Sequence, residues 1–436
     1  MRTLDLPYSN YLIPDSPEFN TQVRLFDGTH FPRYPTQLKR FPLVVSLFSS
    51  LPTDQTFLND EQRTYLLQYN ERVAEKNARI KEIFSDYPYK VKFLEDQSSL
   101  DVIRRITAGE GEELQKEIHQ GLINLGLNAL LIPEEYGGLE LDLLFAAAVS
   151  EGLGSGVAPI PFIGSYVMAP LAIMHGGSNS QKKEYLNKIA SNEISFGVGL
   201  TEYIAAREDA GIEIDGSKAS GRALFVIDGD HASHFVLADK NGVMCIVRAE
   251  DAEVELVELT SVDKTRGYFE ILLNNADVDV LENSSESAEA ITKTIDAGRI
   301  MLAADSVGAS QVMIDKSVEY AKERKQFGRV IGSFQAVKHM CAEMAAELEP
   351  CYAIVWHAAH CFNNVPEEAR LMACQSKSHV SEVSKMVAKK ATEVHGGMGF
   401  TDLLGLHYWF KRIGMNRQLL GSPELVREEA GRVQGF

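Results

Sequence analysis

YAKERKQFG (residues 320–328), continued by SFQAV (residues 333–337), joins two long segments of helical periodicity. Arg324 and Gln326 offer hydrogen-bond donors that suit a pyrophosphate, and Phe327 offers a flat face to an aromatic ring. A run of this kind between two helices is ordinary by itself. Its meaning therefore depends on the segments that surround it.

The composition indicates a globular protein of several domains. The chain has 436 residues, 45% hydrophobic and 24% charged, and can bury a core for two or three domains. The formal net charge of −18 argues against binding to nucleic acid or anionic membranes, which requires a basic face. Five cysteines without CxxC spacing suggest a reducing, cytoplasmic location. The N-terminus lacks the apolar core of a signal peptide, and no membrane insertion is expected.

Changes in the residue pattern along the chain predict four regions. Residues 1–56 are rich in Pro, Tyr and Phe and are expected to form an irregular N-terminal extension. Residues 57–195 carry helical periodicity, with Asp60 as a possible N-cap of the first helix. Residues 196–281 consist of short β-branched runs separated by turns, and predict a middle β domain. Residues 282–436 return to helical periodicity and predict a C-terminal helical domain.

The expected elements follow from these patterns. Helices are predicted at about 112–127, 141–153, 164–175, 180–191, 288–324, 334–363, 366–395 and 404–420. Strands are predicted at about 196–200, 223–227, 234–238, 244–248, 254–259 and 268–273, with a hairpin turn at 239–242. Within the helix 288–324, Gly308 and the neighbouring small residues Ala303, Ala304 and Ala309 are expected to allow close contact with another helix.

Five further pieces give the opening stretch a specific meaning. They are IPEEYGG (132–138), LTE (200–202), DAGR (296–299), HGGMGFT (395–401) and LLGSP (419–423). Their order and spacing over about residues 57–436 resemble the acyl-CoA dehydrogenase family. The resemblance implies an α+β multi-domain fold, with an N-terminal α-helical domain, a β-barrel-like middle sheet and a C-terminal four-helix bundle.

The same resemblance implies an FAD-dependent oxidoreductase of lipid metabolism that desaturates an acyl-CoA or a related acyl thioester. An electron-transfer flavoprotein or a similar acceptor would take the electrons, and the chain would form a homo- or hetero-oligomer, as a dimer or tetramer. The implied flavin contacts are Thr201, Phe225, Arg324, Gln326, Phe327, Gln335, Glu393, Gly396 and Gly397. Those at 324, 326, 327 and 335 would reach the flavin of an adjacent subunit.

Individual positions carry different implied roles. Thr201 would contact the flavin ring from the sheet, and Phe225 would take the place of the family's ring-stacking Trp. Gly396 and Gly397 would let the backbone approach the dinucleotide, although such a pair can also simply end a helix.

Asp296 and Arg299, one helical turn apart, resemble the pair that meets the CoA-thioester tail. A surface ion pair between them is the alternative.

The sequence departs from the family at the catalytic base. In the family, a carboxylate removes the α-proton of the thioester while the β-hydride passes to the flavin. The counted position of that carboxylate holds Leu420, and the alternative position, on the helix beside Arg299, holds Gly298. Ile227 stands where Thr or Ser is usual, and Glu393 where Gln is common. The sequence therefore assigns no catalytic residue.

Three interpretations remain open at this stage. The chain is one subunit of a heteromeric dehydrogenase, like relatives in steroid degradation, and its partner supplies the base. Alternatively, it is self-sufficient and uses another acid, with Glu202, Asp402 and Glu424 the nearest by sequence. In the third, its flavin chemistry is altered, as in desulfinase-like or nitroalkane-oxidase-like proteins, or it is a non-catalytic, flavin-free structural partner.

Two competing signals are weaker. His357 and His360 share a helix face, but no carboxylate or second cysteine stands at ligand spacing beside them, so no metal site is expected. The glycines of 152–156 follow a predicted helix and not a strand, which argues against a Rossmann dinucleotide loop.

Overall fold

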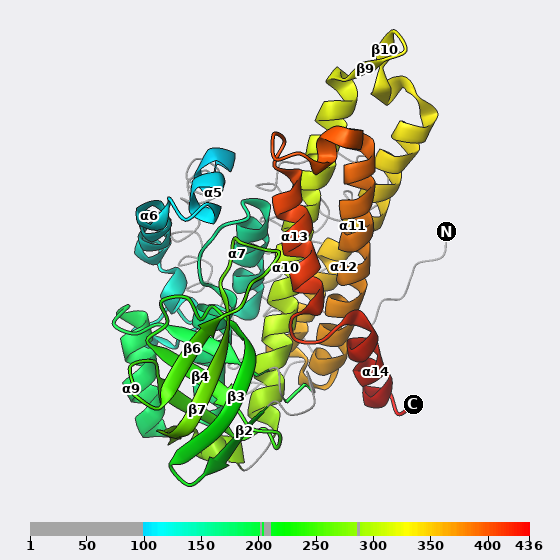
Figure 1. The fold of residues 1–436 in the computed structure, drawn as a ribbon. Coiled ribbons are helices and arrows are strands. Elements are labelled where there is room, and N and C mark those ends of the chain that lie inside the picture. The colour runs from blue at the N-terminus through cyan, green and yellow to red at the C-terminus, as the bar shows by residue number, and fades with distance from the viewer. Residues whose placement is uncertain (1–98, 201–202, 205–210, 286–287) are drawn as a thin grey trace, which may run out of the picture. The chain divides into compact units, whose positions relative to one another are not determined.

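The computed structural model describes residues 99–200, 203–204, 211–285 and 288–436, all of which belong to one unit, Leu94–Phe436 (Figure 1). The expected N-terminal extension, the helix predicted near Asp60 and the expected flavin contact Thr201 lie outside the described residues. None of the described helices combines the length and apolar character that a membrane span requires.

The first described region is helical. Its α-helices are α5 (Leu100–Thr107), α6 (Glu112–Asn124), α7 (Leu143–Ser155), α8 (Ala169–Gly176) and α9 (Asn179–Ala190), with the π-helical turn η5 (Ile163–Met168) before α8. α9 begins with a capping box, in which the side chains of Ser178 and Gln181 satisfy backbone N–H groups of the first turn. The predicted helix at 164–175 therefore exists, but its first part is π-helical.

The middle region is a mixed sheet. Its strands are β1 (Phe196–Gly199), β2 (Gly211–Asp215), β3 (Lys218–Ile227), β4 (His234–Ala238), β5 (Met244–Arg248), β6 (Val254–Glu258), β7 (Tyr268–Asp277) and β8 (Asp279–Val280). The order is β6-β7-β3-β1-β4-β5-β8, with β2 beside β3, and only the β1–β4 pair is parallel. Among the described strands, β6 and β8 stand at the two ends of this order and do not pair with each other. The multi-domain α+β fold is therefore confirmed, but the barrel-like closure is not.

Asp228, the residue after β3, attaches this sheet to the helical region. Its carboxylate accepts hydrogen bonds from the backbone N–H groups of Phe162, Gly164 and Ser165, at 2.8, 2.7 and 3.2 Å. These are the free donors at the start of η5, where a carboxylate is favourable. The end of β3 is thereby fixed against η5.

The C-terminal region is a helical bundle. Its helices are α10 (Glu289–Glu323), α11 (Gln335–Asn364), α12 (Pro366–His395) and α13 (Leu406–Gln418), followed by α14 (Pro423–Val433). α12 packs against α10, α11, α13 and α14, which confirms the four-helix bundle and adds α14. Pro366 starts α12 as the first helical residue, where its missing N–H costs nothing.

Two glycines bring α7 and α10 into close contact. A Cβ on Gly308 of α10 would lie 1.9 Å from the carbonyl oxygen of Glu151 in α7. A Cβ on Gly154 of α7 would lie 2.0 Å from the carbonyl oxygen of Asp305 in α10. Each helix therefore needs glycine where the other backbone crosses it, which confirms the role predicted for Gly308.

Gly308→Ala is expected to lower the free energy of unfolding by about 1–3 kcal/mol, because the added methyl group forces the two backbones apart. Urea unfolding followed by circular dichroism measures this. Gly414→Ala in α13 is the matched control, since no described atom lies within 4 Å of the added Cβ. This control should be neutral or stabilising, by up to about 1 kcal/mol, and an equal loss in both variants would contradict the close-contact explanation.

A buried charge cluster joins the three regions at Asp305 of α10. Its carboxylate accepts hydrogen bonds from Arg266, in the loop between β6 and β7, and from Arg412 and Asn416 of α13, the last two at 3.0 and 2.6 Å. Arg412 also donates to the carbonyl of Ala158, 3.0 Å away in the first helical region. Burial opposes ionisation, but Arg266 and Arg412 lower the pKa of Asp305 below its ordinary value.

Candidate functional site

The opening stretch forms a β-hairpin at one end of the bundle (Figure 1). β9 (Lys325–Gln326) pairs with β10 (Arg329–Val330), with Gln326 opposite Arg329, and Phe327 and Gly328 form the turn with φ of 53° and 76°. Positive φ at both positions is the geometry of a type I′ hairpin turn. Phe327 is 92% exposed, and Arg324 and Gln326 are exposed too. The side chains predicted to reach a flavin are therefore open to solvent.

The other implied flavin contacts in this region lie at the same end of the bundle. Gln335 is the first, exposed residue of α11, and Glu393 is exposed in the last turn of α12. Gly396 ends α12 with φ 58° and ψ −139°, a conformation that favours glycine, and no described atom lies within 4 Å of a Cβ built on Gly396 or Gly397. The rings of Tyr320 and His395, 4.6 Å apart, join the end of α10 to that of α12.

Asp296 and Arg299 lie far from this end. The helix α10 is continuous from Glu289 to Glu323, so the 1.5 Å rise per residue separates Arg299 from Glu323 by about 36 Å. One chain therefore does not bring its hairpin and its Asp296–Arg299 pair into the same site. The structure places the two sets of predicted site residues at different ends of α10.

Arg299 is fully buried, and all its contacts among the described residues are internal. It donates to both carboxylate oxygens of Glu429 in α14, at 2.6 and 3.0 Å, and to the carbonyl of Leu420 at 2.9 Å. Arg370 of α12 bridges Glu429, at 2.7 Å, and Asp296. Burial raises the pKa of Asp296 to about 7, against the opposing effect of Arg370 and Arg299.

This network replaces the simple pair that the sequence suggested. Asp296 and Arg299 are not a surface ion pair, because both are buried and each pairs with another residue. Their role toward a CoA tail stays a prediction. The sequence spacing did not reveal Arg370 or Glu429, since both come from other helices and neither belongs to a recognisable motif.

The two expected base positions touch each other. A Cβ built on Gly298 would lie 2.5 Å from the Cδ1 of Leu420 and 2.7 Å from the sulfur of Met168 in η5. Leu420 and Met168 are buried, so apolar side chains occupy the two positions at which the resemblance implies a carboxylate. The absence of a side chain at Gly298 provides the space for the other two.

Leu420 has a backbone conformation that is unusual for leucine. Its φ is 56°, and Gly421 follows with φ 105°. The left-handed region costs a residue other than glycine about 1–3 kcal/mol and persists where the surroundings impose it. The hydrogen bond from Arg299 to the Leu420 carbonyl holds this backbone.

Phe225 is presented by a bulge in the sheet. The pairing of β3 with β7 shifts register between Ala223 and Val226, and Phe225 has a φ of 51°. This bulge leaves the Phe225 ring 41% exposed, whereas its neighbours Val226 and Ile227 are buried. The side chain is thereby partly open to solvent, and its role in stacking a flavin stays a prediction.

The acids considered above as alternative catalytic bases are Glu202, Asp402 and Glu424, and those that the structure describes pair with other groups. Glu202 lies outside the described residues. A hydrogen bond from His407 lowers the pKa of Asp402, which also pairs with Arg104 at 3.1 Å. Backbone and Ser422 hydrogen bonds, with Arg417, lower the pKa of Glu424 to about 2. Asp402 and Glu424 are thus weak bases near neutral pH.

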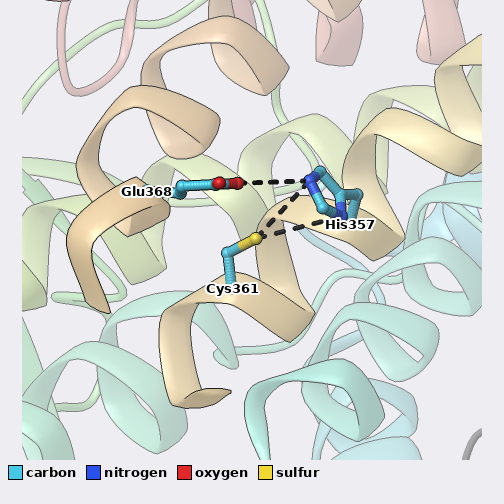
Figure 2. A group of neighbouring side chains, drawn as sticks. All are labelled: His357, Cys361 and Glu368. Carbon is cyan, nitrogen blue, oxygen red and sulfur yellow. Dashed lines mark hydrogen bonds and ion pairs between the residues drawn. The ribbon is translucent and has the colours of Figure 1, made fainter. Parts of the chain in front are cut away.

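The sequence patterns also did not predict that Glu368 lies near His357. Glu368, in the first turn of α12, comes within 3.9 Å of His357, and Cys361 within 3.5 Å (Figure 2). The expectation that no metal site lies here rested on spacing along one helix and did not include the next helix. The described residues therefore contain a cluster of three potential metal ligands.

Lys377 of α12 is buried beneath the segment that carries Leu420. Its Nζ donates to the carbonyl oxygens of Asn416 and Arg417 at the end of α13, the latter at 3.0 Å. Burial, with Arg299 and Arg417 nearby, holds the pKa of Lys377 well below its ordinary value. The folded protein therefore releases a proton that the unfolded chain retains up to about pH 10.

Stability is expected to rise with pH through Lys377, because the unfolded chain binds more protons than the folded one between the two pKa values. This contribution is lost as the pH falls. Lys377→Met removes the titrating group. Between about pH 7 and about pH 9, the urea midpoint of the wild type should therefore rise relative to that of the variant. Lys389→Met, at an exposed position of α12, should show no such change; parallel pH profiles for wild type and Lys377→Met would contradict the assignment.

Known proteins resemble both helical regions. Residues 92–193 match the family model described as acyl-CoA dehydrogenase, N-terminal domain, and residues 288–434 match acyl-CoA dehydrogenase, C-terminal domain. Together the two models cover more than half of the chain. Among curated proteins, the chain is 26% identical over 350 residues to the caffeyl-CoA reductase-Etf complex subunit CarC of Acetobacterium woodii, covering 75% of this chain and 89% of that protein.

Solved structures show the same fold. A variant of the Tcur3481-Tcur3483 steroid ACAD matches with a TM-score of 0.73 and 22% identity, covering 82% of this chain and 98% of that one. The ChsE4-ChsE5 complex from Mycobacterium tuberculosis matches with a TM-score of 0.66 and 22% identity, covering 78% and 96%. The order of helical region, sheet and bundle, the six sequence pieces and the two family models agree, and the chain belongs to the acyl-CoA dehydrogenase family.

Proposed function

We propose that the chain is one subunit of an FAD-dependent acyl-CoA dehydrogenase built from two kinds of subunit, and that its partner supplies the catalytic base. The contact between Leu420 and Gly298 carries this proposal, because it fills both expected base positions with groups that accept no proton. Of the alternative acids that the structure describes, Asp402 and Glu424 both have lowered pKa values, which gives a self-sufficient enzyme less support.

The exposed end of the bundle fits one part of an FAD. Arg324, Gln326 and Gln335 are exposed donors in or next to the hairpin and at the start of α11, and the glycine pair after α12 has open space in front of its backbone. An arginine fork and amide donors suit a pyrophosphate, and backbone without a Cβ allows a ligand to approach closely. Exposed Phe327 and Phe225 offer flat apolar faces.

The chain's residues would therefore bind and orient the flavin of a partner. Arg324 would neutralise a phosphate, and Phe327 would pack against an aromatic part of the cofactor. The flavin, when bound, supplies the acceptor for the hydride that leaves the β-carbon of the acyl thioester. The α-proton would go to a carboxylate of the partner, because a C–H of this acidity requires a positioned base.

The relatives are consistent with an assembly of unlike chains. CarC is by its description a subunit of a complex with Etf, and the ChsE4-ChsE5 structure is described as a complex. We therefore propose an electron-transfer flavoprotein or similar protein as the electron acceptor.

Reconstitution tests the proposal. The chain is purified alone and together with a family member that has Glu directly before Gly at the position of Leu420. The proposal expects little flavin in the chain alone, and flavin that bleaches with an acyl-CoA in the mixture. Flavin that is retained and bleached by the chain alone would contradict it. A mixture that forms a complex but never binds flavin would indicate a structural partner instead.

A further inference from the structure

A compact group of three potential metal ligands joins α11 to α12. His357 and Cys361 lie one turn apart near the end of α11, so they share a helix face, and Glu368 comes from the first turn of α12. Figure 2 shows the three side chains turned toward one another. Their ligand atoms all lie within 4.8 Å of one another.

One of the ligand–ligand distances matches a metal coordination shell, and a second is close to it. The Nε2 of His357 lies 3.5 Å from the sulfur of Cys361 and 3.9 Å from the Oε2 of Glu368. A tetrahedral ion with a metal–sulfur bond of about 2.3 Å and a metal–nitrogen bond of about 2.0 Å separates sulfur and nitrogen by about 3.5 Å. The nitrogen–oxygen distance needs to shorten by about half an ångström, and rotation of the glutamate side chain can supply this.

We propose that His357, Cys361 and Glu368 bind a divalent cation of the zinc type. Thiolate, imidazole and carboxylate together suit a borderline-soft ion such as Zn²⁺ and not Mg²⁺ or Ca²⁺, which prefer oxygen ligands. Cys361 is buried, whereas the side chains of His357 and Glu368 are 36% and 43% exposed. An ion can therefore enter from solvent, and a water molecule completes the fourth position.

Binding balances charge at the site. The Cys361 thiol loses its proton to solvent as the sulfur–metal bond forms, and no electron is transferred. One thiolate and one carboxylate then neutralise the two positive charges of the ion, with His357 neutral. The protein needs no further counter-charge at the junction.

The ion would connect two helices across a short turn. Only Val365 separates α11 from α12, and the ligands lie on both sides of it. A ligand that binds only the folded state stabilises it in proportion to the logarithm of its concentration over the dissociation constant. The inference concerns this junction, which is separate from the hairpin and from Leu420, so it does not depend on the proposed function.

Cobalt titration tests the site. The full chain is treated with a chelator and a thiol reductant, exchanged into metal-free buffer and titrated with Co²⁺. We expect one equivalent to bind, with thiolate-to-cobalt charge-transfer absorption in the near ultraviolet and tetrahedral bands in the visible, and Zn²⁺ should displace it. Cys361→Ser should abolish the charge-transfer absorption. His357→Ala and Glu368→Gln should weaken binding at least about tenfold, since even outer-shell partners are worth that much.

Two neighbours are matched controls. Cys341→Ser removes a partly exposed thiol of α11, and Glu367→Gln removes the carboxylate next to Glu368. Neither should change the spectrum or the affinity. Charge-transfer absorption that survives Cys361→Ser, or affinity unchanged in His357→Ala and Glu368→Gln, overturns the proposal. The latter two positions are part-exposed, so these variants are expected to fold, and circular dichroism checks this.

Discussion

Asp305→Asn is expected to lower the free energy of unfolding by about 3–5 kcal/mol, the typical cost of removing one partner from a buried ion pair. The change leaves Arg266 and Arg412 buried without the carboxylate that they share. Because those arginines come from the loop between β6 and β7 and from α13, the loss should loosen the sheet from the bundle. Urea unfolding followed by fluorescence and by circular dichroism measures the effect.

Asp277→Asn is the matched control. Its ion pair with Lys218, at 2.8 Å, lies on the surface, where the aspartate side chain is 75% exposed. Exposed pairs contribute little, so the control should unfold like the wild type. Similar effects of the two substitutions would contradict a special role for the buried cluster.

Arg324→Ala is expected to weaken flavin binding by the reconstituted two-subunit enzyme about 10- to 100-fold, because a charge-assisted hydrogen bond contributes about 1.5–3 kcal/mol. Arg324 is exposed at the end of α10, so the stability of the isolated chain should not change. Flavin fluorescence during equilibrium dialysis of the complex measures the affinity, and thermal unfolding of the isolated chain measures the stability.

Lys322→Ala supplies the control, with an exposed cation one residue before Glu323 in the same helix. It should leave flavin affinity within a small factor of the wild type. Unchanged affinity in Arg324→Ala, or an equal loss in Lys322→Ala, would exclude a specific phosphate contact by Arg324.

The sequence predicted most elements because their signals are local. α12 was predicted at its observed bounds, since Pro366 marks its start and the glycines after His395 mark its end. α14 was missed because the chain was expected to end its last helix at Leu420. In fact Ser422 caps a new helix and accepts a hydrogen bond from the N–H of Leu425. β2 was missed because its five residues combine two charges with flanking glycine and turn residues.

The candidate site was only partly predictable, because its decisive contacts are non-local. The sequence identified Leu420 and Gly298 as inert positions, but only the folded chain shows that they touch each other and Met168. The outward direction of Phe225 depends on a register shift against β7, which no pattern within β3 encodes. Glu368 approaches His357 for the same reason, since a separate helix brings it there.

The length of α10 has a consequence for how such a chain can evolve. One end of this rigid helix leads into the hairpin, and the other part holds Gly298 and Arg299, about 36 Å away. Substitutions around Leu420 can therefore accumulate without disturbing the hairpin, and the reverse also holds. After a gene duplication, one copy could therefore lose its catalytic base and still be retained by selection, because its hairpin would bind the cofactor of the other copy.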